Sequence, residues 1–149
     1  MKTIAQQLSI KDFPFIITDK DGNQTYSEDT YGFWNKREYD ENGKETYFEN
    51  TTGYWSKREY DKNGKQTYSE NSKGLWIKRE YDSKGKETYS EDSNGFWIKR
   101  EYDKNGKESY YENSDRGIID NRPKKHVTLT MKEIAQKLGV AIETLQIKD

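Results

Sequence analysis

Tryptophan and lysine recur in this sequence at a spacing suited to binding flat or charged ligands. Four tryptophans stand 21 residues apart, at Trp34, Trp55, Trp76 and Trp97. A lysine follows each by two positions, at Lys36, Lys57, Lys78 and Lys99, and an arginine follows each lysine, at Arg37, Arg58, Arg79 and Arg100. A second aromatic position holds Tyr47, Tyr68 and Tyr89. Rings beside cations stack on sugars or single-stranded bases, and Tyr, Trp and Arg dominate protein interfaces, so these are the candidate binding residues.

Residues suited to catalysis are few outside this pattern. The one histidine is His126, so a His-based triad or a multi-histidine metal site cannot form within one chain. Glutamates such as Glu38 and Glu49 could exchange protons, but an exposed sheet neither desolvates them nor builds a pocket. The segment that begins at Asp40 lacks the later acidic ligands of a calcium loop. We therefore predict a protein that is not an enzyme, with no catalytic residue, metal site or cofactor.

The 21-residue spacing extends to the glycines and to a five-residue segment. Glycines recur in two series, Gly22, Gly43, Gly64, Gly85 and Gly106, and Gly32, Gly53, Gly74 and Gly95. The segment Lys-Arg-Glu-Tyr-Asp begins at Lys36, Lys57, Lys78 and Lys99. Self-similarity at a fixed period predicts a tandem-repeat architecture.

Each repeat has the pattern of two strands and two turns. Runs rich in Tyr, Trp and Thr are separated by pairs such as Asn42-Gly43 and by Asn/Asp-x-x-Gly, as at Asn50 to Gly53. Asn-Gly between such runs predicts a two-residue type I′ turn, which needs positive φ at both residues. The second pattern predicts a type I turn closed by a glycine bulge.

The odd period constrains how the strands pair. Side chains alternate between the two faces of a sheet, so identical faces in every repeat require one turn to shift the pairing by an odd step. A two-residue turn after Glu41 supplies that step. The predicted pairs are Glu41–Lys44, Tyr39–Thr46, Glu38–Tyr47, Lys36–Glu49, Tyr47–Lys57 and Glu49–Trp55. One face then carries the Trp-Lys-Glu and Tyr-Glu residues, and the other carries Phe33, Asn35, Arg37, Tyr39, Thr46 and Phe48.

We expect a mainly β protein: a meandering antiparallel repeat sheet of about ten strands, part of it a single layer, with short helical caps at its ends. The expected segments are an N-terminal helical cap (1–12), the β-hairpin repeat array (13–117), a linker (118–127) and a C-terminal helical cap (128–149). The caps are expected because bare sheet edges promote aggregation.

Charge and hydropathy restrict the partners. The formal net charge of −1, from 26 basic and 27 acidic residues interleaved along the 149-residue chain, disfavours nucleic acid as the ligand. No run is long and apolar enough to cross a membrane, and the first residues lack the pattern of a signal peptide. We therefore expect no membrane association and a cytoplasmic location.

Two parts of the chain resemble known families. Tyr-Asp-x-x-Gly followed by a later Tyr and Gly, from Thr18 to Gly117, resembles the YD repeats of Rhs-type proteins and small tandem-repeat proteins of bacteria and bacteriophages. The segment from Thr128 to Leu145 resembles the first two helices of a helix-turn-helix unit, with Gly139 at the turn. It departs from that unit because too few residues follow for a third helix, and because its second helix carries Glu143 and no arginine.

The resemblance and the repeated surface together favour a non-enzymatic binder of a protein or ribonucleoprotein, such as a phage-type inhibitor of a host defence nuclease. One alternative is a carbohydrate- or cell-wall-binding aromatic repeat. Another is nucleic-acid binding through the helix-turn-helix-like segment or the Trp, Tyr and Lys face. Open sheet edges also predict homo-oligomers formed by edge pairing.

Overall fold

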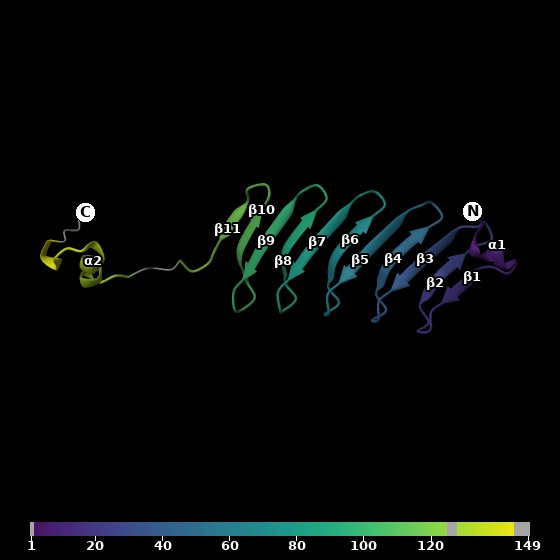
Figure 1. Cartoon of the computed structure of the whole chain (residues 1–149), viewed down its shortest axis with the longest axis horizontal. Helices are drawn as coiled ribbons and strands as arrows, with labels where there is room; N and C mark the ends of the chain where they lie inside the picture. The colour runs from purple at the N-terminus through teal and green to yellow at the C-terminus, as the bar shows by residue number, and fades with distance from the viewer. Residues whose placement is uncertain (1, 125–127, 145–149) are drawn as a thin grey trace.

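The computed structural model describes residues 2–124 and 128–144, in which eleven strands form one antiparallel sheet in sequential order (Figure 1). The strands are β1 (Phe15–Thr18), β2 (Gln24–Glu28), β3 (Trp34–Tyr39), β4 (Glu45–Asn50), β5 (Trp55–Tyr60), β6 (Gln66–Asn71), β7 (Trp76–Tyr81), β8 (Glu87–Asp92), β9 (Trp97–Tyr102), β10 (Glu108–Asn113) and β11 (Ile118–Asp120). The mainly β meander predicted from the sequence is confirmed, with one strand more than expected.

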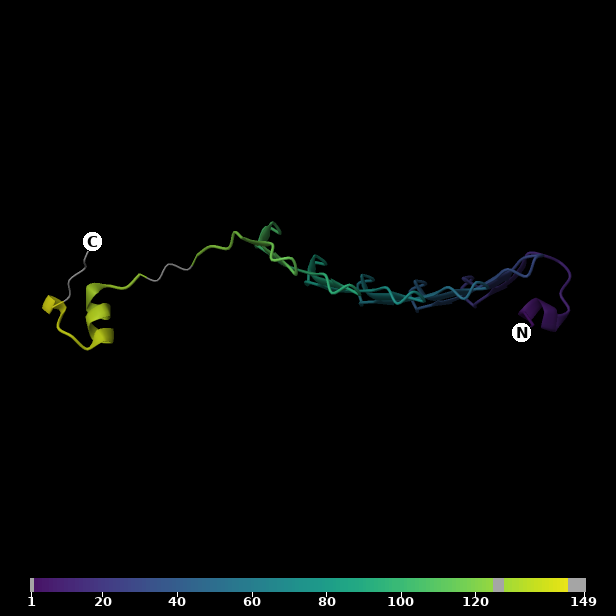
Figure 2. The same cartoon turned by 90° about the horizontal axis from the view of Figure 1, so that it is seen from above.

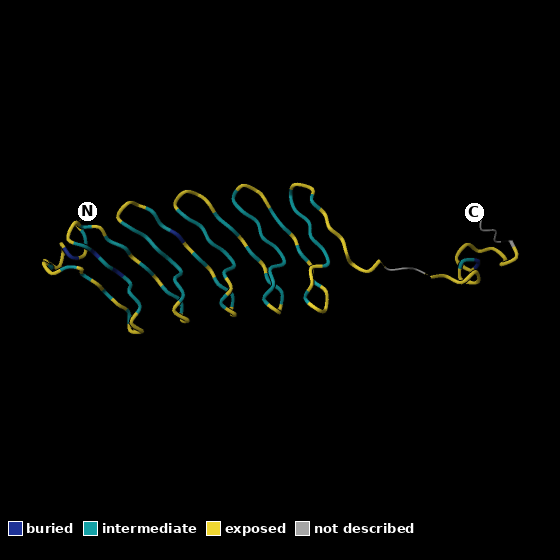
Figure 3. The backbone as a smooth tube through the Cα atoms, turned by 180° about the vertical axis from the view of Figure 1, so that it is seen from behind, coloured by how far each residue is buried: buried dark blue, intermediate teal, exposed yellow. Residues whose placement is uncertain are grey.

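The sheet is a single thin layer, which Figure 2 shows edge-on as a curved band. Most strand residues are half-buried and most turn residues are exposed (Figure 3). The only buried apolar residues in the described part of the chain are Ala5, Tyr26 and Ala135. Because no second layer supplies a core, the sheet depends on backbone hydrogen bonds and on cross-strand side-chain pairs, each contributing roughly 0.2–1 kcal/mol.

The two turns of each repeat have the same geometry. In the β3–β4 turn the Gly43 amide donates to the Asp40 carbonyl at 3.0 Å, and the Asp40 amide donates to the Lys44 carbonyl at 2.9 Å. The β4–β5 turn repeats this pattern from Asn50 to Gly53, with positive φ at the glycine. The prediction of a glycine-bulge turn is confirmed there.

The prediction of a type I′ turn at Asn42-Gly43 is wrong, because Gly43 has a φ of 75° while Asn42 does not have positive φ. The physical reason lies in Asp40, whose Oδ1 accepts the amides of Asn42 and Lys44, both at 2.9 Å. These two bonds hold the amide of Asn42 toward the Asp40 carboxylate, as in an Asx turn. The turn therefore needs the left-handed conformation only at Gly43.

A β-bulge supplies the odd step that the type I′ turn was expected to supply. Tyr39 lies opposite Glu45 and not opposite Thr46, so Thr46 is an extra residue on β4. The same shift leaves one extra hydroxyl residue in each of the other odd-to-even hairpins: Thr25, Thr67, Thr88 and Ser109. The pairs Lys36–Glu49, Glu38–Tyr47, Tyr47–Lys57 and Glu49–Trp55 are confirmed.

Two helices and one helical turn lie outside the sheet. They are α1 (Ile4–Leu8), α2 (Met131–Leu138) and the 3₁₀ turn η1 (Ile142–Thr144). Each α-helix starts with a threonine capping box and ends in a left-handed residue, Ser9 or Gly139. Helix α1 is held to β2 by a hydrogen bond from the Ala5 amide to Glu28, whereas α2 lies away from the sheet in Figures 1 and 2.

The four segment boundaries stay predictions, although the first three residues of the predicted linker form β11. The described part of the C-terminal segment does not cover the β11 edge (Figure 1). His126 and residues 145–149, the end of the predicted C-terminal cap, lie outside the described residues. Among residues 2–124 and 128–144 no helix has the length and apolar character needed to cross a bilayer.

Candidate binding surface

The predicted binding residues divide between the two faces of the sheet. Cross-strand pairing puts the tryptophans, the lysines and Tyr47, Tyr68 and Tyr89 on one face, called here the first face. Arg37, Arg58, Arg79 and Arg100 alternate with the lysines along the strands, so they lie on the opposite, second face. A ligand on one face of the sheet therefore meets either the aromatic and lysine set or the arginine set.

First-face lysines are partly engaged by their neighbours. Lys36 Nζ lies 5.5 Å from the centre of the Tyr47 ring and 2.8 Å from Glu38 Oε1. The hydrogen bond to Glu38 raises the pKa of Lys36. Lys57 Nζ lies 5.4 Å from the centre of the Trp55 ring. The aromatic faces on which a ligand could stack are thus shared with cations of the same surface.

The first face also carries glutamates, which are not among the candidate binding residues predicted from the sequence. The Tyr47 hydroxyl donates to Glu49 at 3.1 Å, and Tyr89 and Tyr110 donate to Glu91 and Glu112 at 3.1 and 2.8 Å. Burial, followed by the bond to Glu49, raises the pKa of Tyr47. The recurring Tyr-x-Glu pattern in the sequence could have revealed these glutamates, because residues two apart on a strand share a face.

Helix α1 covers one copy of this Tyr-Glu pair. Glu28 is 2% exposed and accepts three hydrogen bonds, from the Thr3 hydroxyl at 2.6 Å, the Ala5 amide at 3.2 Å and the Tyr26 hydroxyl at 2.8 Å. Burial acts to raise the pKa of Glu28, but these bonds outweigh it and lower that pKa. The corresponding pairs in later repeats have no helix above them in the part of the chain that the structure describes.

An open groove of about 710 Å³ lies between α1 and the first face. Its lining includes Ile4 and Gln7 from α1 and Tyr26, Trp34 and Lys36 from the sheet. The rings of Tyr26 and Trp34 stack at a centroid distance of 6.2 Å. At this end of the first face both Tyr26 and Glu28 are buried.

The second face carries a ladder of ion pairs that crosses from hairpin to hairpin. Glu45 Oε2 lies 3.2 Å from Arg37 Nε, and its other oxygen pairs with Arg58 Nη1. Two hairpins on, Glu87 joins Arg79 at 3.5 Å to Arg100 at 2.7 Å. Because these side chains are about one quarter to one third exposed, each pair contributes on the order of 0.2–1 kcal/mol.

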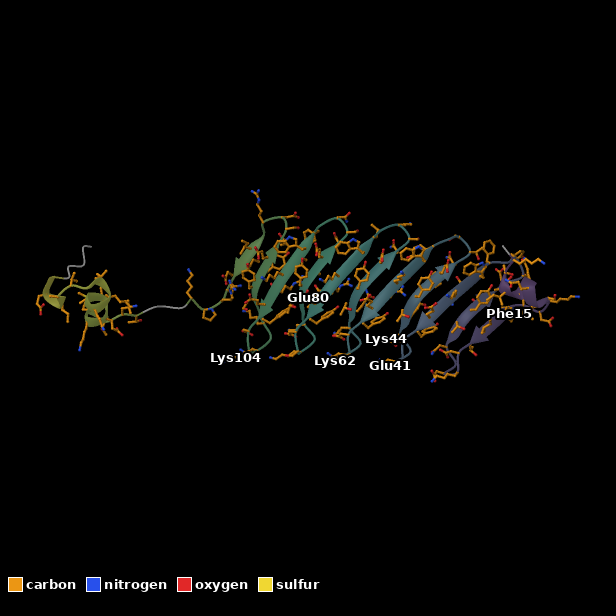
Figure 4. The ribbon with its side chains drawn as sticks, in the orientation of Figure 1. Phe15, Glu41, Lys44, Lys62, Glu80 and Lys104 are labelled. Atoms are coloured by element: carbon orange, nitrogen blue, oxygen red, sulfur yellow. The ribbon has the colours of Figure 1, made fainter. Side chains whose placement is uncertain are left out.

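Second-face tyrosines also connect successive hairpins. Each hydroxyl donates to a backbone carbonyl 15 residues earlier: Tyr39 to Gln24, Tyr60 to Glu45, Tyr81 to Gln66 and Tyr102 to Glu87, at 2.9–3.0 Å. Lys44 Nζ lies 5.2 Å from the centre of the Tyr60 ring. Figure 4 shows Lys44 beside the row of turns that contains Glu41, Lys62 and Lys104. These contacts fix the position of each hairpin relative to the preceding hairpin.

The comparisons with known proteins identify the architecture. No protein-family model matches the chain, and no curated protein matches it either. The Photorhabdus luminescens Tc holotoxin pore with a mutant TccC3 matches with a TM-score of 0.51 and 16% identity over 67% of this chain. TcdB2-TccC3-Cdc42 matches at 0.50 and 15% over 66%, and TcdB2-TccC3-TEV at 0.51 and 14% over 76%.

The matched part spans only 5–6% of those toxin chains. At 14–16% identity the likeness shows a shared fold and nothing of the toxins' activity. The match to Tc toxin chains is consistent with the Rhs-like repeat resemblance stated from the Tyr-Asp-x-x-Gly pattern.

Proposed function

We propose that this protein binds a protein partner through the first face of its repeat sheet and acts by that binding rather than by catalysis. The observation that carries the proposal is the recurrence of one Trp, Lys, Tyr and Glu arrangement on a single open face in successive hairpins. Rigid aromatic side chains beside charged groups supply contact area at a low cost in conformational entropy. Repetition extends that arrangement along a surface large enough for a macromolecule.

The charge of the first face favours a protein over a nucleic acid. The strand lysines of this face are four: Lys36, Lys57, Lys78 and Lys99. Its strand glutamates are nine: Glu28, Glu38, Glu49, Glu59, Glu70, Glu80, Glu91, Glu101 and Glu112. A phosphate backbone needs an excess of cations, which this face does not offer. Binding of a nucleic acid by the first face is therefore the less favoured form of the proposal.

Affinity capture from bacterial lysate tests the proposal. The tagged chain is compared with W55A/W76A, which removes two first-face rings, and with K62A/K104A, a matched control in the turns. We expect a single stoichiometric protein with the wild type and the control, and its loss with W55A/W76A, while circular dichroism shows that all three proteins keep the sheet. Equal capture by the wild type and both variants, or capture of nuclease-sensitive material alone, would contradict the proposal.

A finer form of the proposal is that the partner is a host defence nuclease, free or as a ribonucleoprotein, which the protein inhibits. It is supported by the resemblance to small phage repeat proteins. The test is phage plating on cells with a defined defence nuclease, with and without the chain. We expect plating to rise only when the wild type or K62A/K104A is expressed; unchanged plating with every nuclease tested argues against inhibition.

Carbohydrate binding is a second candidate because the stacked rings of Tyr26 and Trp34 line the groove beside α1. A glycan array separates the two functions. Saturable binding of a sugar that W34A removes would support this candidate over a protein partner.

A further inference from the structure

Two hollows occupy corresponding places on the second face. The first, the β5–β6 hollow, has a volume of about 160 Å³, and the second, the β7–β8 hollow, about 190 Å³. The β5–β6 hollow is lined by Tyr54, Ser56, Arg58, Gln66, Ser69, Glu70, Asn71 and Leu75. Of these residues, Glu70 belongs to the first face, because it pairs with Lys57 across the strands. The β7–β8 hollow is lined by residues that each stand 21 positions after a residue of the first hollow: Ile77, Arg79, Glu87, Ser90, Glu91, Asp92 and Phe96. The second hollow is therefore an internal comparison for the first.

The two hollows differ in charge. Glu87 and Asp92 bring two carboxylates to the β7–β8 hollow, whereas Gln66 and Asn71 bring two amides of similar shape to the β5–β6 hollow. Each hollow has one arginine on this face. Arg79 thus faces an excess of negative charge, and Arg58 faces none from the side chains of its own hairpin on this face.

Arg58 lacks an ion pair that the other three arginines have. In each of those three arginines, Nε lies 3.2–3.5 Å from a glutamate of the same hairpin. The pairs are Arg37 with Glu45, Arg79 with Glu87 and Arg100 with Glu108. Gln66 stands at that place for Arg58, whose ion pair to Glu45 runs through Nη1 alone. Arg58 lines the hollow, and its Nε has no glutamate of its own hairpin to pair with.

Ser56 adds a second, independent sign of a missing ligand. It is 6% exposed, and its Oγ is the one buried side-chain polar atom without a hydrogen-bond partner among the residues described. An unpaired buried polar group costs on the order of 1–3 kcal/mol, so such groups normally have a partner. Ile77 and Ile98, at the corresponding positions of the next two hairpins, have no such group.

We propose that the β5–β6 hollow binds a carboxylate group, which takes the place of the carboxylate that position 66 lacks. Arg58 Nε is its charged donor, and the hydroxyl of Ser56 and the side-chain amide of Gln66 are its neutral donors. Leu75, which is 51% exposed at the rim, contacts the stem of the carboxylate-bearing group. Taking about 30 Å³ for each water molecule, the hollow holds roughly five waters, a size that suits a carboxylate on a short aliphatic stem.

A carboxylate can come from an acidic side chain of a bound protein or from a small free acid. Both meet the same donors. The site lies on the face opposite to the proposed protein-binding surface. Its test is therefore independent of the proposed function.

A titration followed by nuclear magnetic resonance tests the site on the full chain. The probes are sodium acetate, acetyl-Ala-Glu-Ala-amide and its neutral analogue acetyl-Ala-Gln-Ala-amide. We expect saturable shifts of the Arg58 Nε and Gln66 side-chain signals with acetate and with the Glu peptide, and no shifts with the neutral Gln peptide. Tighter binding of the peptide than of acetate indicates an acidic side chain as the natural ligand, and equal binding indicates a free acid; shifts that do not saturate overturn the proposal.

Exchanging the hollows gives matched variants. Q66E/N71D reproduces the carboxylates of the β7–β8 hollow and is expected to weaken binding at Arg58 at least tenfold. E87Q/D92N is expected to create a second saturable response at Arg79 Nε. Because every exchanged residue already occurs at the corresponding place of a neighbouring repeat, both variants should keep the fold, which the dispersion of the remaining signals reports. Unchanged binding in Q66E/N71D overturns the proposal.

Discussion

The Tyr26 hydroxyl donates a 2.8 Å hydrogen bond to Glu28 Oε2, and the same carboxylate anchors α1. The corresponding tyrosine and glutamate of the next repeat, Tyr47 and Glu49, form the same bond at 3.1 Å without a helix. The pair is thus an element of the sheet itself, and α1 adds its hydroxyl and amide donors to one copy of it. This relation makes the docking of α1 separable from the stability of the sheet.

Replacing Glu28 by Gln should release α1. The amide keeps the shape of the carboxylate but has one acceptor oxygen where Thr3, Ala5 and Tyr26 now donate to two, so docking should weaken by about 1–3 kcal/mol. Hydrogen exchange at the Ala5 amide measures the effect. E49Q is the matched control and should leave that exchange rate unchanged; slow exchange retained in E28Q would show that Glu28 does not hold the helix.

Alkaline pH should destabilise the α1 end of the sheet through Tyr26. Burial, aided by the bond to Glu28 and its charge, raises the pKa of Tyr26 to about 12 from an ordinary value of 10.0. Between these values the unfolded chain binds fewer protons than the folded one, so stability is complete below pH 10 and falls as pH rises toward 12.

Urea unfolding on both sides of pH 10 measures this fall for the wild type and for Y26F. The pKa values of other tyrosines are also raised, for example that of Tyr89 by burial, so only the difference between the two proteins reports Tyr26. We expect the smaller fall in Y26F. Identical pH profiles would contradict the raised pKa.

Replacing Gln66 by Glu should complete the ion-pair ladder. The new carboxylate lies between Arg58 and Arg79, in the position that Glu45 and Glu87 occupy in neighbouring hairpins. We expect a gain of roughly 0.5–1 kcal/mol in the free energy of unfolding at low salt. The gain should shrink near 1 M salt, where the screening length is about 3 Å. A gain that salt does not change would point to packing rather than charge.

Replacing Gly64 by Ala should cost more than replacing Gly53. Both glycines have positive φ, 75° and 79°, and left-handed backbone costs an alanine about 1–2 kcal/mol. An added Cβ at Gly64 would lie 2.6 Å from Lys44 Cε, whereas one at Gly53 meets nothing within 4 Å. Moving Lys44 also disturbs its contact with the Tyr60 ring.

Chemical unfolding of G53A, G64A and the double variant K44A/G64A measures these costs. We expect G64A to lose more than G53A, and K44A/G64A to recover part of that difference. Equal losses in G53A and G64A would show that Lys44 yields without cost.

Sheet-edge association should depend on β11. Ile118 and Ile119 are 60% and 54% exposed, and Ile16 on the opposite edge strand β1 is 48% exposed. A free edge of this kind pairs with another strand unless a charge opposes it. Light scattering should show mass that rises with concentration for the wild type and less so for I119K. A monomer at all concentrations would contradict edge pairing.

Much of the sheet could be predicted from residue spacing. Trp34, Lys36 and Glu38 share a face because side chains alternate along a strand, and pairs such as Lys36–Glu49 followed from the turn spacing. The position of Thr46 could not be predicted in this way. Asn42-Gly43 is compatible with two turn geometries, and the choice between them rests on hydrogen bonds to Asp40, not on the dipeptide.

The candidate binding surface could also be predicted only in part from residue spacing. The first-face aromatic residues were evident from their period, since each lies on the same face in every repeat. The pairing of Arg58 with Glu45, 13 residues apart, depends on the bulge that turns Glu45 toward the second face, so residue spacing alone did not reveal it.

The sequence by itself determined the 21-residue period, the strands and the Trp-Lys-Glu and Tyr-Glu residues of the first face, because the alternation of side chains is a local property of an extended chain. Only the tertiary structure decided where the bulges fall, that α1 docks on Glu28, and that Ser56, Arg58 and Gln66 surround one hollow. The reason is that these relations join residues on different strands or elements. Their distances depend on the register that backbone hydrogen bonds select.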